Sequence, residues 1–379
     1  MTFTVNGSPL TERYLAKSLF KTDGNLYAWG NNSIGQLGLG NLTRRFSPTQ
    51  VGTLSDWSRI SNSKGAGLRF GYSAGIKTDG TLWVWGDNLS GQLGLNTNIG
   101  SLSPVQVGTL SNWLNVDCGY AHTIAIKTDG TLWGWGNNGF GQLGLNNITN
   151  YSTPVQIGLL SNWYQIACGY WNTLVIKTDS TLWACGYNLD GELGLSDITH
   201  RSIFVQVGTL NDWSQVDCDN YSTSAIKRNG TLWTWGWNNF GQLAQSDTID
   251  RSSPTQVGTL SNWSKVSGGH QYFEFIKTDG TLWACGYNPV GQLGLSNTTN
   301  RSSPVQVGTN SNWSQVACGY LHTSAIKTDG TLWSWGSNGQ GQLGISRAGN
   351  RSSPTQVGTL NQWSQVANGV ITTFAIDIV

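Results

Sequence analysis

Two tryptophans, Trp171 and Trp237, are the residues of this chain best suited to binding chemistry. The sequence holds 20 tryptophans, and all the others recur at fixed positions of an internal repeat. Side chains that we expect close to these two are Tyr187, Tyr221 and Phe240, together with the acidic Asp190, Glu192 and Asp219. Aromatic anchors beside charges are typical of protein interfaces and of surfaces that stack against sugars. We therefore predict a surface that binds a protein or a glycan, with neutral variation of loop residues as the alternative.

A second candidate surface is an insertion that follows Trp57. Lys21 and Lys77 occupy equivalent repeat positions 56 residues apart, whereas the later copies lie 50 residues apart. The side chains of the insertion that could contact a partner are Lys64, Arg69 and Phe70. Loops that protrude from a rigid scaffold often carry function. Because this loop is short, a tolerated insertion is the favoured interpretation and a wedge for a partner is the alternative.

Catalytic and metal-binding chemistry find little support. The chain has 4 histidines, and none has a second ligand at the close spacing that a metal site requires. No nucleophile motif and no phosphate-binding loop is present. His122 and His322 occupy one repeat position, so we expect structural imidazoles that form hydrogen bonds between strands. The sequence predicts no enzyme, no cofactor and no metal.

The six cysteines also follow the repeat. Cys118, Cys168, Cys218 and Cys318 share one position, and Cys185 and Cys285 share another. A disulfide needs Cα atoms within about 7 Å, and equivalent positions of separate units are usually farther apart. We expect small buried side chains rather than bridges.

A repeated stretch positions all of these residues. It reads Lys-Thr-Asp-Gly-Thr-Leu-Trp-Gly-Trp-Gly at 127–136, and further copies begin at Lys21, Lys77, Lys177, Lys227, Lys277 and Lys327. Within one unit, strands are expected at 116–118, 123–127, 131–135 and 154–157, with a two-residue hairpin turn of the primed type at Asp129-Gly130. The third strand is apolar on both faces, so it needs a neighbour on each side. Seven such units predict a closed, all-β, seven-bladed β-propeller of four-stranded antiparallel blades with repeats of about 50 residues.

Up-and-down strands place the loops on two different faces. Loops between strands one and two and between strands three and four lie on one face, which we call the variable face because its sequence differs between copies. The other loops repeat Lys-Thr-Asp-Gly and Gly-Thr-Leu-Ser-Asn-Trp, and they form the uniform face. A specific partner needs distinct side chains. Recognition is therefore expected on the variable face, where Trp171 and Trp237 lie.

The motif Trp-Gly-Asn-Asn-Gly-Phe-Gly-Gln-Leu-Gly at 135–144, with Cys-Gly-Tyr-Leu-His-Thr at 318–323, resembles the regulator of chromosome condensation repeat family. The resemblance covers about residues 15–379 and implies seven four-stranded blades. Family members include exchange factors for small GTPases, photoreceptors, ubiquitin-ligase components and bacterial enzyme inhibitors, so the fold carries over and the function does not. The near-identical, weakly charged repeats resemble bacterial and phage members.

The chain ends raise the question of how the ring closes. Either residues 16–20 or residues 371–376 can supply the missing strand, and we expect the C-terminal hairpin to do so. Residues 1–20 are then a docking or closure segment, and residues 21–379 form the propeller. Residues 4–15 resemble a docking segment of phage virion proteins. This resemblance predicts a virion surface or tail-associated component that contacts virion proteins through its N-terminus.

Composition narrows the function further. A net charge of +1 with 11% charged residues gives little support for nucleic-acid binding. No apolar run reaches the roughly 20 residues that span a bilayer, and residues 1–20 lack the apolar core of a signal peptide. We expect a cytoplasmic or virion-associated chain. The leading hypothesis is a non-enzymatic binding and structural scaffold; the alternatives are a small-GTPase regulator of the exchange-factor type and a lectin-like adhesin.

Overall fold

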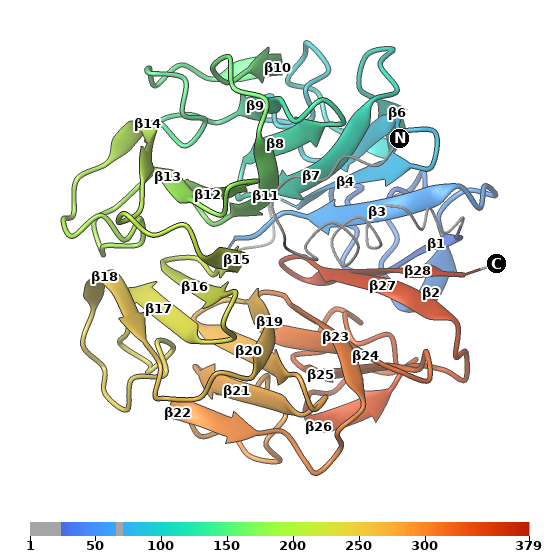
Figure 1. Cartoon of the computed structure of the whole chain (residues 1–379). Coiled ribbons are helices and arrows are strands. Elements are labelled where there is room, and N and C mark those ends of the chain that lie inside the picture. Colours follow the sequence, from blue (N-terminus) through green and yellow to red (C-terminus); the bar gives the residue numbers. More distant parts are fainter. Residues whose placement is uncertain (1–23, 66–70, 379) are drawn as a thin grey trace, which may run out of the picture.

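The computed structural model describes residues 24–65 and 71–378. Within these residues, strands β1 to β28 form seven antiparallel sheets of four strands each, arranged as blades around a central axis (Figure 1). The innermost strand of every blade contacts the innermost strands of both neighbours, so the ring is closed. The structure confirms the seven-bladed β-propeller.

Blade 2 illustrates the repeat. From the axis outward it contains β7 (Trp113–Cys118), β8 (His122–Lys127), β9 (Leu132–Gly136) and β10 (Tyr151–Gln156). The first strand begins three residues earlier than the sequence predicts, because Trp113 pairs with Lys127 across the sheet. The outermost strand is irregular, since its register against β9 shifts between Tyr151 and Val155.

The other blades repeat this plan. Blade 1 contains β3 (Trp57–Asn62), β4 (Tyr72–Lys77), β5 (Leu82–Gly86) and β6 (Ser101–Gln106). Blade 3 contains β11 (Trp163–Cys168), β12 (Asn172–Lys177), β13 (Leu182–Gly186) and β14 (Arg201–Gln206). Blade 4 contains β15 (Trp213–Cys218), β16 (Ser222–Lys227), β17 (Leu232–Gly236) and β18 (Arg251–Gln256). Blade 5 contains β19 (Trp263–Gly268), β20 (Tyr272–Lys277), β21 (Leu282–Gly286) and β22 (Arg301–Gln306). Blade 6 contains β23 (Trp313–Cys318), β24 (His322–Lys327), β25 (Leu332–Gly336) and β26 (Arg351–Gln356).

Blade 7 joins the two ends of the propeller. Its strand order is β2 (Arg45–Gln50), β1 (Leu26–Gly30), β28 (Thr372–Asp377) and β27 (Trp363–Asn368). In Figure 1 the blue β1 therefore lies beside the red β28. The C-terminal hairpin closes the ring, as expected from the sequence. The proposed docking segment, residues 1–20, lies outside the described residues, so that prediction stays open.

The turn at Asp129-Gly130 differs from the predicted primed hairpin. A type I′ turn needs positive φ at both central residues and a type II′ turn at the first, but here only the second residue, Gly130, with φ of 78°, has it. The Gly130 amide donates to the Lys127 carbonyl at 2.9 Å, which makes a tight turn that ends in a left-handed glycine. A Cβ at Gly130 would lie 2.2 Å from the Ser161 carbonyl oxygen, so both the conformation and the space require glycine.

Side chains packed between adjacent blades form the core. Trp135 of blade 2 is fully buried, and its indole Nε1 donates to the Gln92 carbonyl of the preceding blade at 2.9 Å. In blade 3, Cys185 takes the equivalent position, with its Sγ 3.4 Å from the Gln142 carbonyl. All six cysteines are free and buried, as predicted. They therefore act as small core residues between blades.

The two repeated histidines are structural, as expected. His122 is fully buried, and its Nε2 lies 3.0 Å from Thr173 Oγ1 of the next blade. The Thr173 hydroxyl donates to the Gln142 carbonyl, so it accepts from Nε2–H and leaves Nδ1 unprotonated. Burial lowers the pKa of His122 to about 3. His322 repeats the arrangement with Thr373 at 2.9 Å.

Candidate partner-binding face

A continuous line of ring side chains crosses the variable face from blade 2 to blade 5. We call it the aromatic ribbon. Its members are Tyr120, Phe140, Tyr170, Trp171, Tyr187, His200, Tyr221, Trp237, Phe240 and Tyr287. All five aromatic residues that the sequence singled out belong to this ribbon.

The first half of the ribbon centres on Trp171. Its ring centroid lies 4.2 Å from that of Tyr170, 5.5 Å from that of Tyr187 and 5.1 Å from that of Phe140. Tyr187 in turn stacks on His200 at 4.8 Å. Trp171 is thus packed on several sides and presents only part of its ring outward.

The second half runs through Trp237. The ring of Tyr170 lies 5.8 Å from that of Tyr221, which lies 6.0 Å from that of Trp237. Phe240 follows at 5.5 Å, and Tyr287 of blade 5 lies 4.4 Å from Phe240. Trp171 and Trp237 therefore belong to one surface and are linked through tyrosines.

Backbone hydrogen bonds hold the loops that carry these rings. The Tyr187 amide donates to the Trp171 carbonyl at 2.9 Å, and the Trp237 amide donates to the Tyr221 carbonyl at 3.0 Å. Each bond ties the loop between the first two strands of a blade to the start of the loop after the third strand. The rings consequently stand side by side on fixed backbone. Little conformational entropy would be lost when such rings bind a partner.

Trp171, Tyr187, Tyr221, Trp237 and Phe240 are all half-buried. Sequence analysis missed Tyr120, Phe140, Tyr170, His200 and Tyr287. Tyr120 and Tyr170 belong to the repeated Cys-Gly-Tyr motif. They were not singled out because only residues that depart from the repeat were selected. Comparing the loops of neighbouring blades would have found them, since every member of the ribbon lies either in the loop between the first and second strands of a blade or in the loop between the third and fourth.

Glu192 does not lie on the surface, although the sequence predicted it there. Its side chain is 1% exposed and lies beneath the variable face, where the other blades carry glutamine. Its Oε2 accepts from the Asp190 amide at 2.9 Å, while Oε1 is buried without a hydrogen-bond partner among the described residues. Burial raises the pKa of Glu192 to about 8. It is a neutral acid under the ribbon, with no surface to offer a partner.

The other two acidic residues of this region differ from each other. Asp219 is buried and accepts from the amides of Tyr221 and Ser222, at 2.7 and 2.5 Å. Burial raises its pKa to about 7. Asp190 is half-buried beside the ribbon, and its pKa is raised by burial and by Asp250. Of these three carboxyls, only Asp190 can reach a partner from the ribbon.

The described part of the insertion, which ends at residue 65, directs Lys64 toward the axis of the propeller. Lys64 Nζ lies 2.5 Å from Asp217 Oδ1 and donates to the Cys218 carbonyl at 2.9 Å, which links blade 1 to blade 4. Burial disfavours the charge, but Asp217 and Asp117 outweigh it and raise the pKa of Lys64. Arg69 and Phe70, the other predicted contact residues, lie outside the described residues. Lys64 therefore has a structural role, and its side chain is largely inaccessible to a binding partner.

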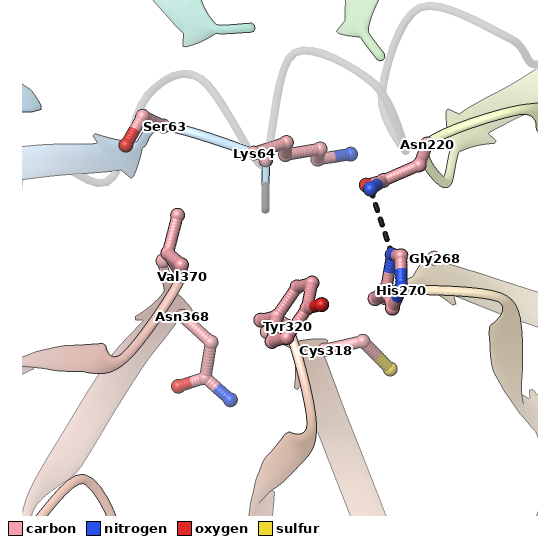
Figure 2. Close-up of a pocket in the computed structure, with 13 residues that line it drawn as sticks. Ser63, Lys64, Asn220, Gly268, His270, Cys318, Tyr320, Asn368 and Val370 are labelled. Carbon is pink, nitrogen blue, oxygen red and sulfur yellow. Dashed lines mark hydrogen bonds between the residues drawn. The ribbon is translucent and has the colours of Figure 1, made fainter. Parts of the chain in front are cut away.

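A small pocket lies beside Lys64. Figure 2 shows the Lys64 side chain pointing toward Asn220, whose amide Nδ2 is 2.7 Å from His270 Nδ1. The His270 ring stacks on Tyr320 at 4.2 Å, and burial lowers the pKa of His270 to about 4. The pocket offers about 10 Å³, which is room for about one water molecule. It is too small to be the main binding site.

A model of the regulator of chromosome condensation (RCC1) repeat matches residues 23–63, 79–126, 129–176, 229–273, 279–326 and 329–376, more than half of the chain. The chain belongs to the RCC1 repeat family. A second model of the same repeat matches residues 113–142, 163–192 and 313–342. The predicted membership of the RCC1 repeat family is therefore confirmed, whereas the predicted bacterial or phage-like origin is not shown.

Curated relatives of this RCC1-repeat chain are similar over short segments. The human X-linked retinitis pigmentosa GTPase regulator is 35% identical over 94 residues, which is 24% of this chain and 9% of that protein. The ultraviolet-B receptor UVR8 of Arabidopsis thaliana is 40% identical over 84 residues, 22% of this chain and 18% of the receptor. The secretion-regulating guanine nucleotide exchange factor of Mus musculus is 44% identical over 70 residues, 18% of this chain and 14% of that protein. The chain thus matches less than a fifth of the length of each relative.

Three solved structures superpose on 93–100% of this chain. Human WBSCR16 superposes with a TM-score of 0.82 at 22% identity, covering 93% of this chain and 98% of that one. Yeast RCC1 (Prp20), bound to Kap60 in its structure, superposes with a TM-score of 0.84 at 17% identity, covering 100% and 96%. A further structure of Prp20p concerns its binding to Gsp1p and histones. At these identities the likeness shows the fold alone.

The part of the chain that the structure describes contains no helix with the length and apolar character needed to cross a membrane.

Proposed function

We propose that this RCC1-repeat chain is a non-enzymatic binding scaffold that recognises a protein or a glycan through its variable face. The aromatic ribbon carries the proposal. It joins rings from blades 2 to 5 into one half-buried surface on loops held by backbone hydrogen bonds. Rigid aromatic anchors supply large contact area at low entropic cost, which is the chemistry of interface hot spots.

Two experiments distinguish a protein partner from a glycan. The first is an affinity capture from source material with the intact chain, identified by mass spectrometry. The second is a glycan array probed with the same chain. In both, the Trp171→Ala/Trp237→Ala variant is compared with Leu159→Ser/Leu160→Ser, which removes the exposed leucines of a turn on the uniform face. Binding lost only from the tryptophan variant supports the proposal, and binding equal in both variants contradicts it.

A regulator of a small GTPase is the second candidate. It is favoured by the 44% identity, over 70 residues, to a protein named as a guanine nucleotide exchange factor. Release of labelled nucleotide from a panel of small GTPases tests it directly. An increase in the release rate that Trp171→Ala/Trp237→Ala abolishes would identify the same face as an exchange surface. No increase for any GTPase of the panel would contradict this second candidate.

Attachment to a virion through the N-terminus stays a proposal with a separate test. It rests on the sequence of residues 4–15, which lie outside the described residues. Because β27 and β28 complete blade 7, a chain without residues 1–14 is expected to keep the propeller. Loss of particle assembly with an unchanged melting temperature would support attachment, and retained assembly would contradict it.

A further inference from the structure

In the described part of the chain, six lysines at the uniform face are held between pairs of tryptophans. Each lysine ends the second strand of its blade, and its ammonium lies over the indole of the third strand and near the indole that begins the first strand. Lys127 Nζ is 3.5 Å from the ring centroid of Trp133 and 4.9 Å from that of Trp113. The other lysines are Lys77, Lys177, Lys227, Lys277 and Lys327. Such contacts stabilise a cation but do not neutralise it.

Carboxylates neutralise only some of these lysines. Lys77 Nζ lies 3.2 Å from Asp56 Oδ2, and Lys227 Nζ lies 3.4 Å from Asp212 Oδ2. At the same repeat position blade 2 has Asn112, and no carboxylate of the described residues lies within 4.0 Å of Lys127 Nζ. The negative charge of Asp129, which lies farther away, raises the pKa of Lys127 and partly offsets the effect of burial. Asp129 also accepts hydrogen bonds from the amide and the hydroxyl of Thr131. Lys127 is therefore a cation with no carboxylate in direct contact among the described residues.

Lys127 lines a groove between blades 1 and 2. The groove is open to solvent and has a volume of about 450 Å³, and Lys127 is its one charged lining residue among those described. Leu110, Trp113, Trp133 and Pro154 supply apolar surface, and Gln106 and Thr153 supply hydrogen-bonding groups. Lys127 itself is 5% exposed, and the lowering of its pKa by burial reflects the cost of keeping this charge out of water. An anion in the groove would relieve that cost.

Neighbouring copies of the groove provide natural comparisons. The groove at Lys77 encloses about 360 Å³ and is lined by the equivalent residues, but Asp56 already neutralises its lysine. In the copy at Lys177, Phe204 replaces the proline and packs 5.4 Å from Trp163. Phe204 therefore packs on the tryptophan whose equivalent, Trp113, lines the groove at Lys127.

We propose that the groove of blades 1 and 2 binds a small aromatic carboxylic acid, with its carboxylate on Lys127 and its ring against Trp133 and Leu110. The volume lies within the range of small-ligand sites, which are mostly apolar with a few placed polar groups. The site lies on the uniform side and is separate from the aromatic ribbon. Its occupation is independent of the partner proposed for the variable face.

Fluorine NMR of two matched probes tests the proposal. 4-Fluorophenylacetate and its neutral amide are each titrated with the full chain, and line broadening is measured. The acid should broaden at least threefold more than the amide, and Lys127→Met should remove at least half of this difference. Equal broadening of acid and amide, or an unchanged difference in Lys127→Met, overturns the proposal.

A gain-of-function variant guards against misfolding of Lys127→Met. Asp56→Asn places at blade 1 the residue that blade 2 already has, and it frees Lys77 in its groove. In crystals soaked with 4-bromophenylacetate, the wild type should show anomalous bromine density at Lys127 and none at Lys77. Asp56→Asn should add a peak at Lys77. Bromine absent from the Lys127 groove, or present at Lys77 in the wild type, contradicts the assignment.

Discussion

Lys64 donates to Asp217 across the centre of the propeller, with Nζ 2.5 Å from Oδ1 although the residues are 153 positions apart. Asp217 also accepts from the Gly268 amide at 3.1 Å, so one carboxylate connects blades 1, 4 and 5. The side chains of Lys64 and Asp217 are only 17% and 21% exposed. Lys64 thus connects blades across the middle of the disc, in addition to the closure of the ring by β28.

Replacing Lys64 tests the role of this contact. Lys64→Met leaves Asp217 partly buried without its cation, and we expect a loss of about 2–4 kcal/mol in the free energy of unfolding. Urea denaturation of the purified chain measures it. The double variant Lys64→Met/Asp217→Asn is the control, and it should recover at least half of the loss because no charge is left unpaired. A Lys64→Met variant as stable as the wild type would show that the contact contributes nothing.

Glu192 predicts a specific dependence of stability on pH. Burial raises its pKa to about 8, so between its ordinary value of 4.5 and pH 8 the folded chain holds a proton that the unfolded chain releases. Stability contributed by this proton is complete below pH 4.5 and is lost as the pH rises to 8. Glu192→Gln restores the residue that the other blades carry. Its free energy of unfolding should therefore exceed that of the wild type by about 2–4 kcal/mol at pH 8 and by little at pH 4.5. Urea unfolding at both pH values measures the difference, and an equal difference at the two would rule out this titration.

The buried histidines predict the opposite dependence. Burial lowers the pKa of His122 to about 3, so between pH 6.5 and 3 the unfolded chain binds a proton that the folded chain excludes. Stability is complete above pH 6.5 and is lost as the pH falls. His122→Asn introduces the residue found at the equivalent position of the next blade, Asn172. Between pH 7 and 5 this variant should lose about 1–2 kcal/mol less free energy of unfolding than the wild type. Thermal unfolding at the two pH values checks it; a variant with the wild-type slope would refute the assignment.

Strand pattern and ring closure could be predicted because they follow from local chemistry. Apolar residues on both faces of the third strand required packed neighbours, and Asp-Gly pairs marked the turns. The reach of Lys64 to Asp217 could not be predicted, since it joins distant blades and no repeat signal accompanies it. The primed turn was wrong because a glycine alone does not reveal the φ of the residue before it.

The candidate site was predictable in part. Trp171 and Trp237 were found because they break the repeat, and the geometry joins them. Tyr170, which connects them, was missed because it belongs to the repeat. Glu192 resembled a surface charge, but its position in the Gly-Gln-Leu-Gly motif is buried in every described blade. A glutamate that replaces the glutamine of this repeated motif is therefore better interpreted as a buried acid.

Truncating the ribbon tryptophans also has a stability cost that must be measured first. Trp171 contacts the rings of Tyr120, Phe140, Tyr170 and Tyr187, and each aromatic pair contributes about 0.5–1.5 kcal/mol. Trp171→Ala/Trp237→Ala should unfold at a lower urea concentration than the wild type while keeping the same far-ultraviolet circular dichroism. An unfolded variant would require Trp171→Leu/Trp237→Leu instead, which retains apolar packing.

The dissociation constant of the captured partner or glycan is the most direct test of the proposed working surface. It is measured by titration calorimetry for the wild type, Trp171→Ala/Trp237→Ala and Leu159→Ser/Leu160→Ser, under conditions where all three are folded. We predict at least a 30-fold weaker affinity for the tryptophan variant, about 2 kcal/mol, and a change below twofold for the leucine variant. Equal affinity of the wild type and the tryptophan variant would contradict a binding role for the aromatic ribbon.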